Sequence, residues 1–219
     1  MTKREAILGT LFVLAMFIGG LVAGYAHGEW PHDCVCSING PKYGGSGTLL
    51  AVGKNGHGLV ISAAHVFEDG NNKGLTCEFP AIKKKFPAKF LAWDTKNDIA
   101  AIDIADAPDI QLPAGKKKKK KSDGPFSCVG YPSYSRHEVR WTVGDYLGYE
   151  KWEPGKTTFL TKQEVASGYS GGARFNRFGE YCGPISGKTG PDTNHMDKTW
   201  GVSGDAMLLF VGKFVEVSK

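Results

Sequence analysis

Short apolar runs separated by turn residues are the feature that most limits the fold of this 219-residue chain. The chain contains 30 glycines and 11 prolines, and apolar runs of strand length lie between them. Two such runs, Gly47–Val52 and Gly58–Ser62, flank the turn Gly53–Gly56 and so predict a β-hairpin. Ile99–Ile104 and Phe126–Gly130 are bounded in the same way. Runs of this length and spacing, with few helical periods, indicate an all-β sandwich or barrel.

The C-terminal segment is the one place where a helix is predicted. Ser203 could cap it, and six of the residues that follow recur at helical spacing. These residues are Ala206, Leu209, Phe210, Lys213, Phe214 and Val217.

The folded part of the chain is predicted to be nearly neutral, although the formal net charge is +5. Without Met1–Ala26 the net charge is +4, and without the six-lysine run Lys116–Lys121 as well it is −2. A basic surface for specific nucleic-acid binding is therefore not indicated. Segment 111–123 is predicted to be a surface linker between two halves, 27–110 and 124–219. Its lysines form either a solvated spacer or a tether to anionic surfaces.

The N-terminal segment predicts export. Lys3 and Arg4 precede the uncharged, apolar stretch Ala6–His27, and Gly24–Ala26 has the small residues of a cleavage site. The segment 1–26 is therefore either a signal peptide or, because it is long enough to span a bilayer, a retained membrane anchor. Both interpretations place the rest of the chain outside the cytoplasm, whether secreted, periplasmic or anchored.

The five cysteines predict disulfides if the chain is exported. They are Cys34, Cys36, Cys77, Cys128 and Cys182. The odd number leaves at least one cysteine unpaired or in an intermolecular bond, and spacing does not define the pairing. A zinc site is the rival interpretation, but the sequence has no Cys-x-x-Cys pair. We therefore predict no metal and no cofactor.

Three separated residues could together form a nucleophilic site. A serine hydroxyl needs an imidazole to accept its proton, a carboxylate to orient the imidazole, and backbone donors for the oxyanion. Ser170 lies between glycines in Gly168–Gly172, where the backbone can turn sharply and expose the hydroxyl. His65 follows one apolar run, and Asp98 precedes another. Taken singly, each has an ordinary explanation as a turn or core residue.

Four motifs in a fixed order make the combination specific. They are Gly-Ser-Gly-Thr at Gly45–Thr48, Ala-Ala-His at Ala63–His65, Asp-Ile-Ala at Asp98–Ala100, and Gly-Tyr-Ser-Gly-Gly at Gly168–Gly172. With them the chain resembles the trypsin-like serine peptidases, most closely the bacterial Deg/HtrA-like branch, over roughly residues 34–215. Asp94 and Asp103 are weaker candidates for the carboxylate.

The resemblance implies two six-stranded antiparallel β-barrels with a C-terminal helix, and a serine endopeptidase site between the barrels. His65 and Asp98 would come from the first barrel and Ser170 from the second. The backbone N–H groups of Gly168 and Ser170 would form the oxyanion hole. A polypeptide substrate would pair with the strand that contains Ile185, Ser186 and Gly187.

Substrate preference stays open between two interpretations. The family places the base of its specificity pocket six residues before the nucleophile, which is Glu164 here, and a carboxylate there would favour Lys or Arg. Alternatively Glu164 faces solvent, and the pocket is small and apolar, lined by Val165 and Ile185.

Two departures from the family pattern carry further expectations. Zymogen-type members have an aspartate before the nucleophile, whereas this chain has Tyr169, so activation by N-terminal cleavage is not expected. Too few residues follow Ser170 to complete a second barrel and add a PDZ domain.

Two other functions compete with the peptidase. Gly168-x-Ser170-x-Gly172 also fits the nucleophile elbow of α/β-hydrolase esterases, although those enzymes place their histidine after the serine. The other alternative is a catalytically silent trypsin-like fold used as a binding module.

Overall fold

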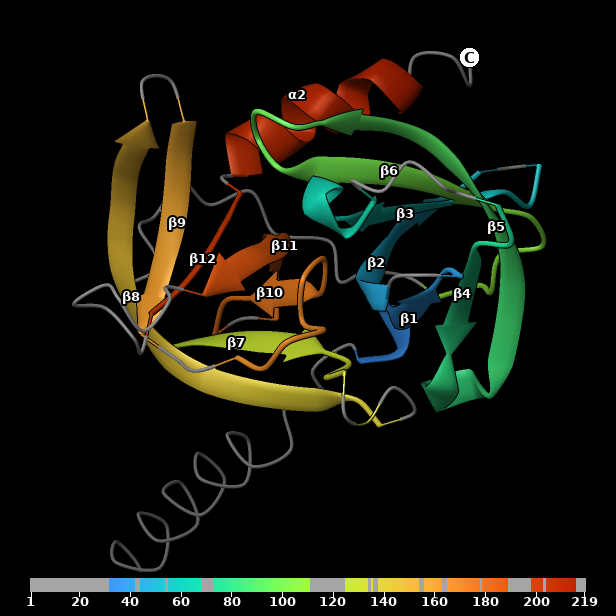
Figure 1. The fold of residues 1–219 in the computed structure, drawn as a ribbon, viewed down its shortest axis with the longest axis horizontal. Helices are drawn as coiled ribbons and strands as arrows, with labels where there is room; N and C mark the ends of the chain where they lie inside the picture. The colour runs from blue at the N-terminus through green and yellow to red at the C-terminus, as the bar shows by residue number, and fades with distance from the viewer. Residues whose placement is uncertain are drawn as a thin grey trace, which may run out of the picture. The chain divides into compact units, whose positions relative to one another are not determined.

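The computed structural model describes residues 32–41, 44–53, 55–67, 73–110, 125–133, 135, 138–153, 156–162, 165–177, 179–188, 198–202 and 204–215. Its strands form two closed six-stranded barrels (Figure 1). The predicted all-β fold is therefore confirmed. The predicted segments 1–26 and Lys116–Lys121 lie outside the described residues.

The first barrel has the strand order β1-β2-β3-β6-β5-β4. Its strands are β1 Val35–Asn39, β2 Gly44–Val52, β3 Gly58–Ser62, β4 Thr76–Phe79, β5 Lys84–Asp94 and β6 Ile99–Ile104. Three short 3-10 helices lie beside them: η1 His32–Cys34, η2 Ala64–Phe67 and η3 Pro80–Ile82.

The second barrel repeats this order as β7-β8-β9-β12-β11-β10. Its strands are β7 Pro125–Gly130, β8 Arg140–Glu153, β9 Lys156–Lys162, β10 Ala173–Phe175, β11 Tyr181–Lys188 and β12 Lys198–Val202. Every pairing among the described strands is antiparallel. These strands do not form the parallel sheet of an α/β-hydrolase, so the fold excludes the esterase alternative.

The predicted hairpin is confirmed as β2 and β3, which pair from Thr48↔Ile61 to Val52↔Gly58. The apolar run 99–104 is β6, and it shows little alternation because both of its faces are buried. Ile102 and Ile104 point into the core of the first barrel. Ile99 and Ala101 instead belong to a second cluster, on the opposite face of the strand.

The C-terminal helix α2 covers that opposite face. It begins at Gly204 and ends at Val215, and it lies along the first barrel at the top of Figure 1. Met207, Phe210 and Val211 pack against β3 and β6. Met207 and Phe210 face the barrel, whereas Leu209 points away from it and is 76% exposed. No helix in the described part of the chain is long and apolar enough to cross a bilayer.

The structure shows the five cysteines as free thiols, and the expected disulfides are not formed in it. Four of the five are buried core residues. Cys36 and Cys77 lie in the core of the first barrel, whereas Cys128 packs in the second. Burial raises the pKa of Cys36 well above its ordinary value, as does its contact with the Cys77 thiol. These side chains serve as small apolar packing residues.

Candidate active site

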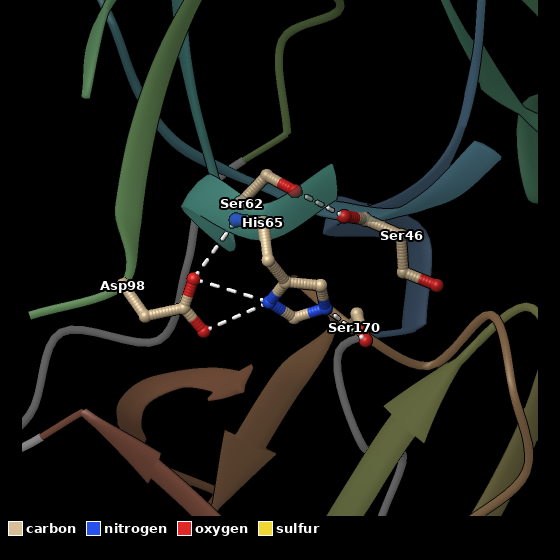
Figure 2. Close-up of polar contacts among 5 residues, drawn as sticks. All are labelled: Ser46, Ser62, His65, Asp98 and Ser170. Carbon is tan, nitrogen blue, oxygen red and sulfur yellow. Dashed lines mark hydrogen bonds and ion pairs between the residues drawn. The ribbon is translucent and has the colours of Figure 1, made fainter. Parts of the chain in front are cut away.

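The structure brings His65, Asp98 and Ser170 into one hydrogen-bonded chain (Figure 2). His65 Nε2 lies 2.8 Å from Ser170 Oγ. His65 Nδ1 lies 3.1 and 3.0 Å from the two carboxylate oxygens of Asp98. The imidazole therefore bridges a hydroxyl of the second barrel and a carboxylate of the first.

Pairing of β3 with β6 explains why His65 and Asp98 meet. The two strands run antiparallel with Ser62 opposite Ala100. His65 lies in η2, just beyond the end of β3, and Asp98 lies just before the start of β6. Both therefore project from the same end of the strand pair.

A tight turn and three donated contacts hold the Asp98 carboxylate in place. Asp98 adopts the left-handed conformation, with φ of 55°, which aspartate tolerates better than most residues. The preceding turn is fixed by Asp94, whose carboxylate accepts bonds from the backbone N–H and the side-chain amide of Asn97. Asp94 thus has a structural role in the turn. Asp98 itself is 6% exposed and also accepts a bond of 2.9 Å from the backbone N–H of His65.

The loop that contains Ser170 has the carbonyl of every residue from 167 to 170 hydrogen-bonded. The donors, in order, are Ser133 N–H at 2.7 Å, Ser46 Oγ–H at 2.8 Å, Gly172 N–H at 2.8 Å and Ser46 N–H at 2.8 Å. Two of these four donors come from Ser46 in β2 of the first barrel. The loop is thus attached to both barrels.

Every second N–H group of the same loop donates a hydrogen bond within the protein. Tyr169 N–H donates to the Ala166 carbonyl, and Gly171 N–H donates to the Ile185 carbonyl. Among the described residues, the N–H groups of Gly168 and Ser170 have no hydrogen-bond partner. Two backbone donors in the loop of the Ser170 hydroxyl are thus left for an oxygen that enters the site.

Glycine is required at both ends of this loop. Gly168 and Gly171 have φ of 97° and 84°, a region that other residues rarely adopt. A Cβ at Gly171 would also collide with the Ser46 carbonyl oxygen and the Ser62 hydroxyl. The glycines predicted to allow the sharp turn do so.

The residues predicted to bind substrate lie close to this loop. Val165 and Ile185 are buried and pack with Cys128 and Tyr169. The pairing of β10 with β11 ends at Pro184. No other described strand pairs with the segment 186–188 on that side, and Ser186 Oγ has no described partner. Glu164 lies outside the described residues.

A second His–Asp pair lies on a different face of the first barrel. His57 Nδ1 lies 2.9 and 3.0 Å from the carboxylate oxygens of Asp103. Both residues line a cavity of about 460 Å³ with Leu91 and Phe214, and neither His65 nor Ser170 borders it. No described cluster of three or more His, Cys, Asp or Glu side chains could hold a metal ion.

Sequence reasoning missed the contribution of Ser46 and Ser62. Ser46 falls inside the Gly45–Thr48 motif, which we used only as a family marker. Ser62 Oγ donates to the Ser46 carbonyl at 2.8 Å (Figure 2). The motif marked Ser46 as a residue of interest, but only the fold shows that Ser46 contacts the Ser170 loop, more than a hundred residues away in the chain.

Comparison with known proteins agrees with this geometry. The sequence model of the trypsin-like peptidase domain matches residues 45–183, which include all three residues of the hydrogen-bonded chain. The chain belongs to the trypsin-like peptidase family. None of the curated protein sequences matches this member of the family.

Solved structures show that the two-barrel fold is shared. An alanine mutant of Rv3671c from M. tuberculosis H37Rv, in an inactive form, is 16% identical, with a TM-score of 0.66. That match covers 84% of this chain and 87% of the other. The Rv3671c protease in an inactive form is 17% identical, with a TM-score of 0.65 over 84% and 89% of the two chains.

Proposed function

We propose that this trypsin-like peptidase is a serine endopeptidase that hydrolyses peptide bonds through an acyl-enzyme on Ser170. The observation that carries the proposal is the contact of 2.8 Å between His65 Nε2 and Ser170 Oγ, with Nδ1 of the same ring on Asp98. All three parts of an activated serine are in contact before any substrate binds. A silent binding module has no need of this arrangement.

The proposed chemistry follows from the roles of the three groups. Asp98 accepts the Nδ1–H, which selects the tautomer whose Nε2 can accept a proton. Ser170 Oγ attacks the scissile carbonyl carbon while its proton moves to Nε2. The resulting imidazolium then protonates the leaving amine, the C–N bond breaks, and water repeats the sequence to release the acid. The N–H groups of Gly168 and Ser170 would stabilise the tetrahedral oxyanion in both steps.

We propose that an extended polypeptide binds along β11 beside Ser186 and Gly187. This mode is supported because no described strand pairs with segment 186–188 on the side where the pairing with β10 ends, and the backbone of an extended chain can add to an unpaired strand edge. Preference for a side chain depends on the Glu164 region. If the pocket is formed by Val165 and Ile185, peptides will be cut after small aliphatic residues; if Glu164 forms its base, after Lys or Arg. Profiling a peptide library with wild type and Glu164→Ala decides between these.

Export, membrane anchoring at residues 1–26 and anionic-surface binding through Lys116–Lys121 remain proposals on sequence grounds. Fractionation of the native cells and salt-dependent binding to anionic vesicles test them separately.

The proposed activity is tested by labelling the protein with a fluorophosphonate and by measuring proteolysis. Wild type should be labelled at Ser170, and Ser170→Ala should not. Replacing Ser170 or His65 with alanine should lower turnover by about 10⁴–10⁶-fold. A folded wild type that is never labelled and cleaves no peptide would support the binding module instead.

A further inference from the structure

We propose that Ser46, a residue of the first barrel, is the positioning residue that holds the oxyanion-hole loop of the second barrel in its active geometry. The inference rests on the proposed function and adds a residue that acts through the loop rather than on the substrate. It starts from the hydrogen bonds of Ser46, which lies in β2 and is fully buried.

Each polar group of Ser46 has a partner. Its N–H donates to the Ser170 carbonyl, and its Oγ–H donates to the Gly168 carbonyl, each at 2.8 Å. Its Oγ accepts a bond of 2.8 Å from the N–H of Tyr131, at the end of β7. Its carbonyl accepts the bond from Ser62 Oγ. One buried serine thus joins two segments of the second barrel to the strand pair that leads to His65.

The peptides that carry the two free donors have their own carbonyls, of Ser167 and Tyr169, bonded to the N–H groups of Ser133 and Gly172. The bonds of Ser46 fix the next peptide plane after each of these. The carbonyl of Gly168 is held by Ser46 Oγ, and the N–H at the other end of that peptide, from Tyr169, is held by Ala166. The peptide from Ser170 to Gly171 is likewise held at both ends, by Ser46 N–H and the Ile185 carbonyl. Rotation of either plane would turn the neighbouring N–H groups of Gly168 or Ser170.

The side-chain hydroxyl of Ser46 holds the Gly168–Tyr169 peptide, whereas its backbone N–H holds the Ser170–Gly171 peptide. Without Oγ, the carbonyl of the half-buried Gly168 loses its donor and the N–H of the buried Tyr131 loses its acceptor. A buried polar group without a partner is costly, so the Gly168 peptide is expected to rotate toward another partner. Such a rotation would weaken the stabilisation of the oxyanion while leaving the substrate edge of β11 unchanged.

The test uses full-length Ser46→Ala with a fluorogenic peptide selected from a library on wild type. We expect kcat to fall about 10- to 100-fold, somewhat less than for removal of a donor itself. KM should stay within about two-fold, because the bond is needed only when the oxyanion forms. The affinity of a boronic acid with the same peptide sequence, which mimics the tetrahedral state, should fall by the same factor as kcat/KM.

Matched variants separate positioning from general damage. Ser37→Ala removes another buried serine of the first barrel, whose Oγ accepts only a bond of 3.3 Å from Asn39, and should leave kcat unchanged. Ser46→Thr keeps the hydroxyl and should recover most of the loss. If Ser46→Ala does not fold, Ser62→Ala removes only the bond to the Ser46 carbonyl and should show the same pattern with a smaller loss.

The inference is overturned if Ser46→Ala folds and has the kcat and boronate affinity of wild type, or if only KM changes. Failure of the proposed function would look different, because wild type itself would then resist fluorophosphonate labelling.

Discussion

Two histidines of the first barrel make nearly the same contact with an aspartate, and only their surroundings distinguish them. His65 and His57 each place Nδ1 about 3 Å from both oxygens of a carboxylate. The Asp98 side chain is 9% exposed, and its histidine contacts Ser170. The Asp103 side chain is 25% exposed and its pair borders a cavity without a nucleophile. What distinguishes the two histidines is therefore the group next to the second ring nitrogen, which for His65 is the Ser170 hydroxyl.

Asp98→Asn should lower kcat by about 10⁴-fold, because an amide can donate to Nδ1 and so favour the inactive tautomer. Asp103→Asn is the matched control and should leave kcat near the wild-type value. Steady-state kinetics on one peptide substrate compares the two. Equal losses in both variants would show that damage to the barrel, and not the tautomer, explains the effect.

At the scale of elements, α2 supports the strands that lead to the site. The helix follows the second barrel in the chain but packs on β3 and β6 of the first, next to the ends that precede His65 and follow Asp98. Phe210 is 3% exposed in this contact and stacks edge-on against Phe214, whereas the adjacent Leu209 is mostly exposed.

Phe210→Ala should lower the free energy of unfolding by about 3–5 kcal/mol, the usual cost of deleting a buried phenylalanine. Leu209→Ala, the neighbouring change on the exposed face, should cost less than about 0.5 kcal/mol. Urea denaturation of the two variants measures both values. A similar cost at both positions would contradict the orientation of α2.

Thiols and phenols that the fold desolvates link the stability of the whole molecule to alkaline pH. Desolvation raises the pKa of Cys34 to about 12 and that of Cys182 to about 11, from an ordinary value of 9.0. Burial also raises the pKa of Tyr131 and Tyr181. In the unfolded chain these groups ionise near their ordinary pKa, while in the fold they keep their protons.

The contribution of these groups to the free energy of unfolding should therefore be constant below about pH 9. It should fall as the pH rises from about 9 toward about 12. The sign follows because the unfolded state releases protons first. Urea denaturation at pH 8, 9, 10 and 11 measures the fall, and Cys34→Ala should make it less steep. A free energy of unfolding that stays constant up to about pH 11 would contradict the raised pKa values of these groups.

Local patterns in the sequence determined several elements and the identity of the three central residues. The β2–β3 hairpin and β6 follow from apolar runs bounded by turn residues, because a run buried on one or both faces must be apolar. Ser170, His65 and Asp98 could be named because their three motifs, together with Gly45–Thr48, occur in the order that the resemblance to the trypsin-like peptidases implies.

Other features of the structure depend on pairing between distant segments, which no local sequence pattern shows. Strand β5 includes Pro87, which local rules disfavour, yet its pairing with β4 ends there and its pairing with β6 begins at Ala88. Strand β8 is rich in charged and glycine residues, and its barrel neighbours β7 and β9 define it. Four of the five cysteines pack as core residues, and Ser46 reaches Gly168 across the two barrels. Such contacts join residues far apart in the chain, so no local window of sequence records them.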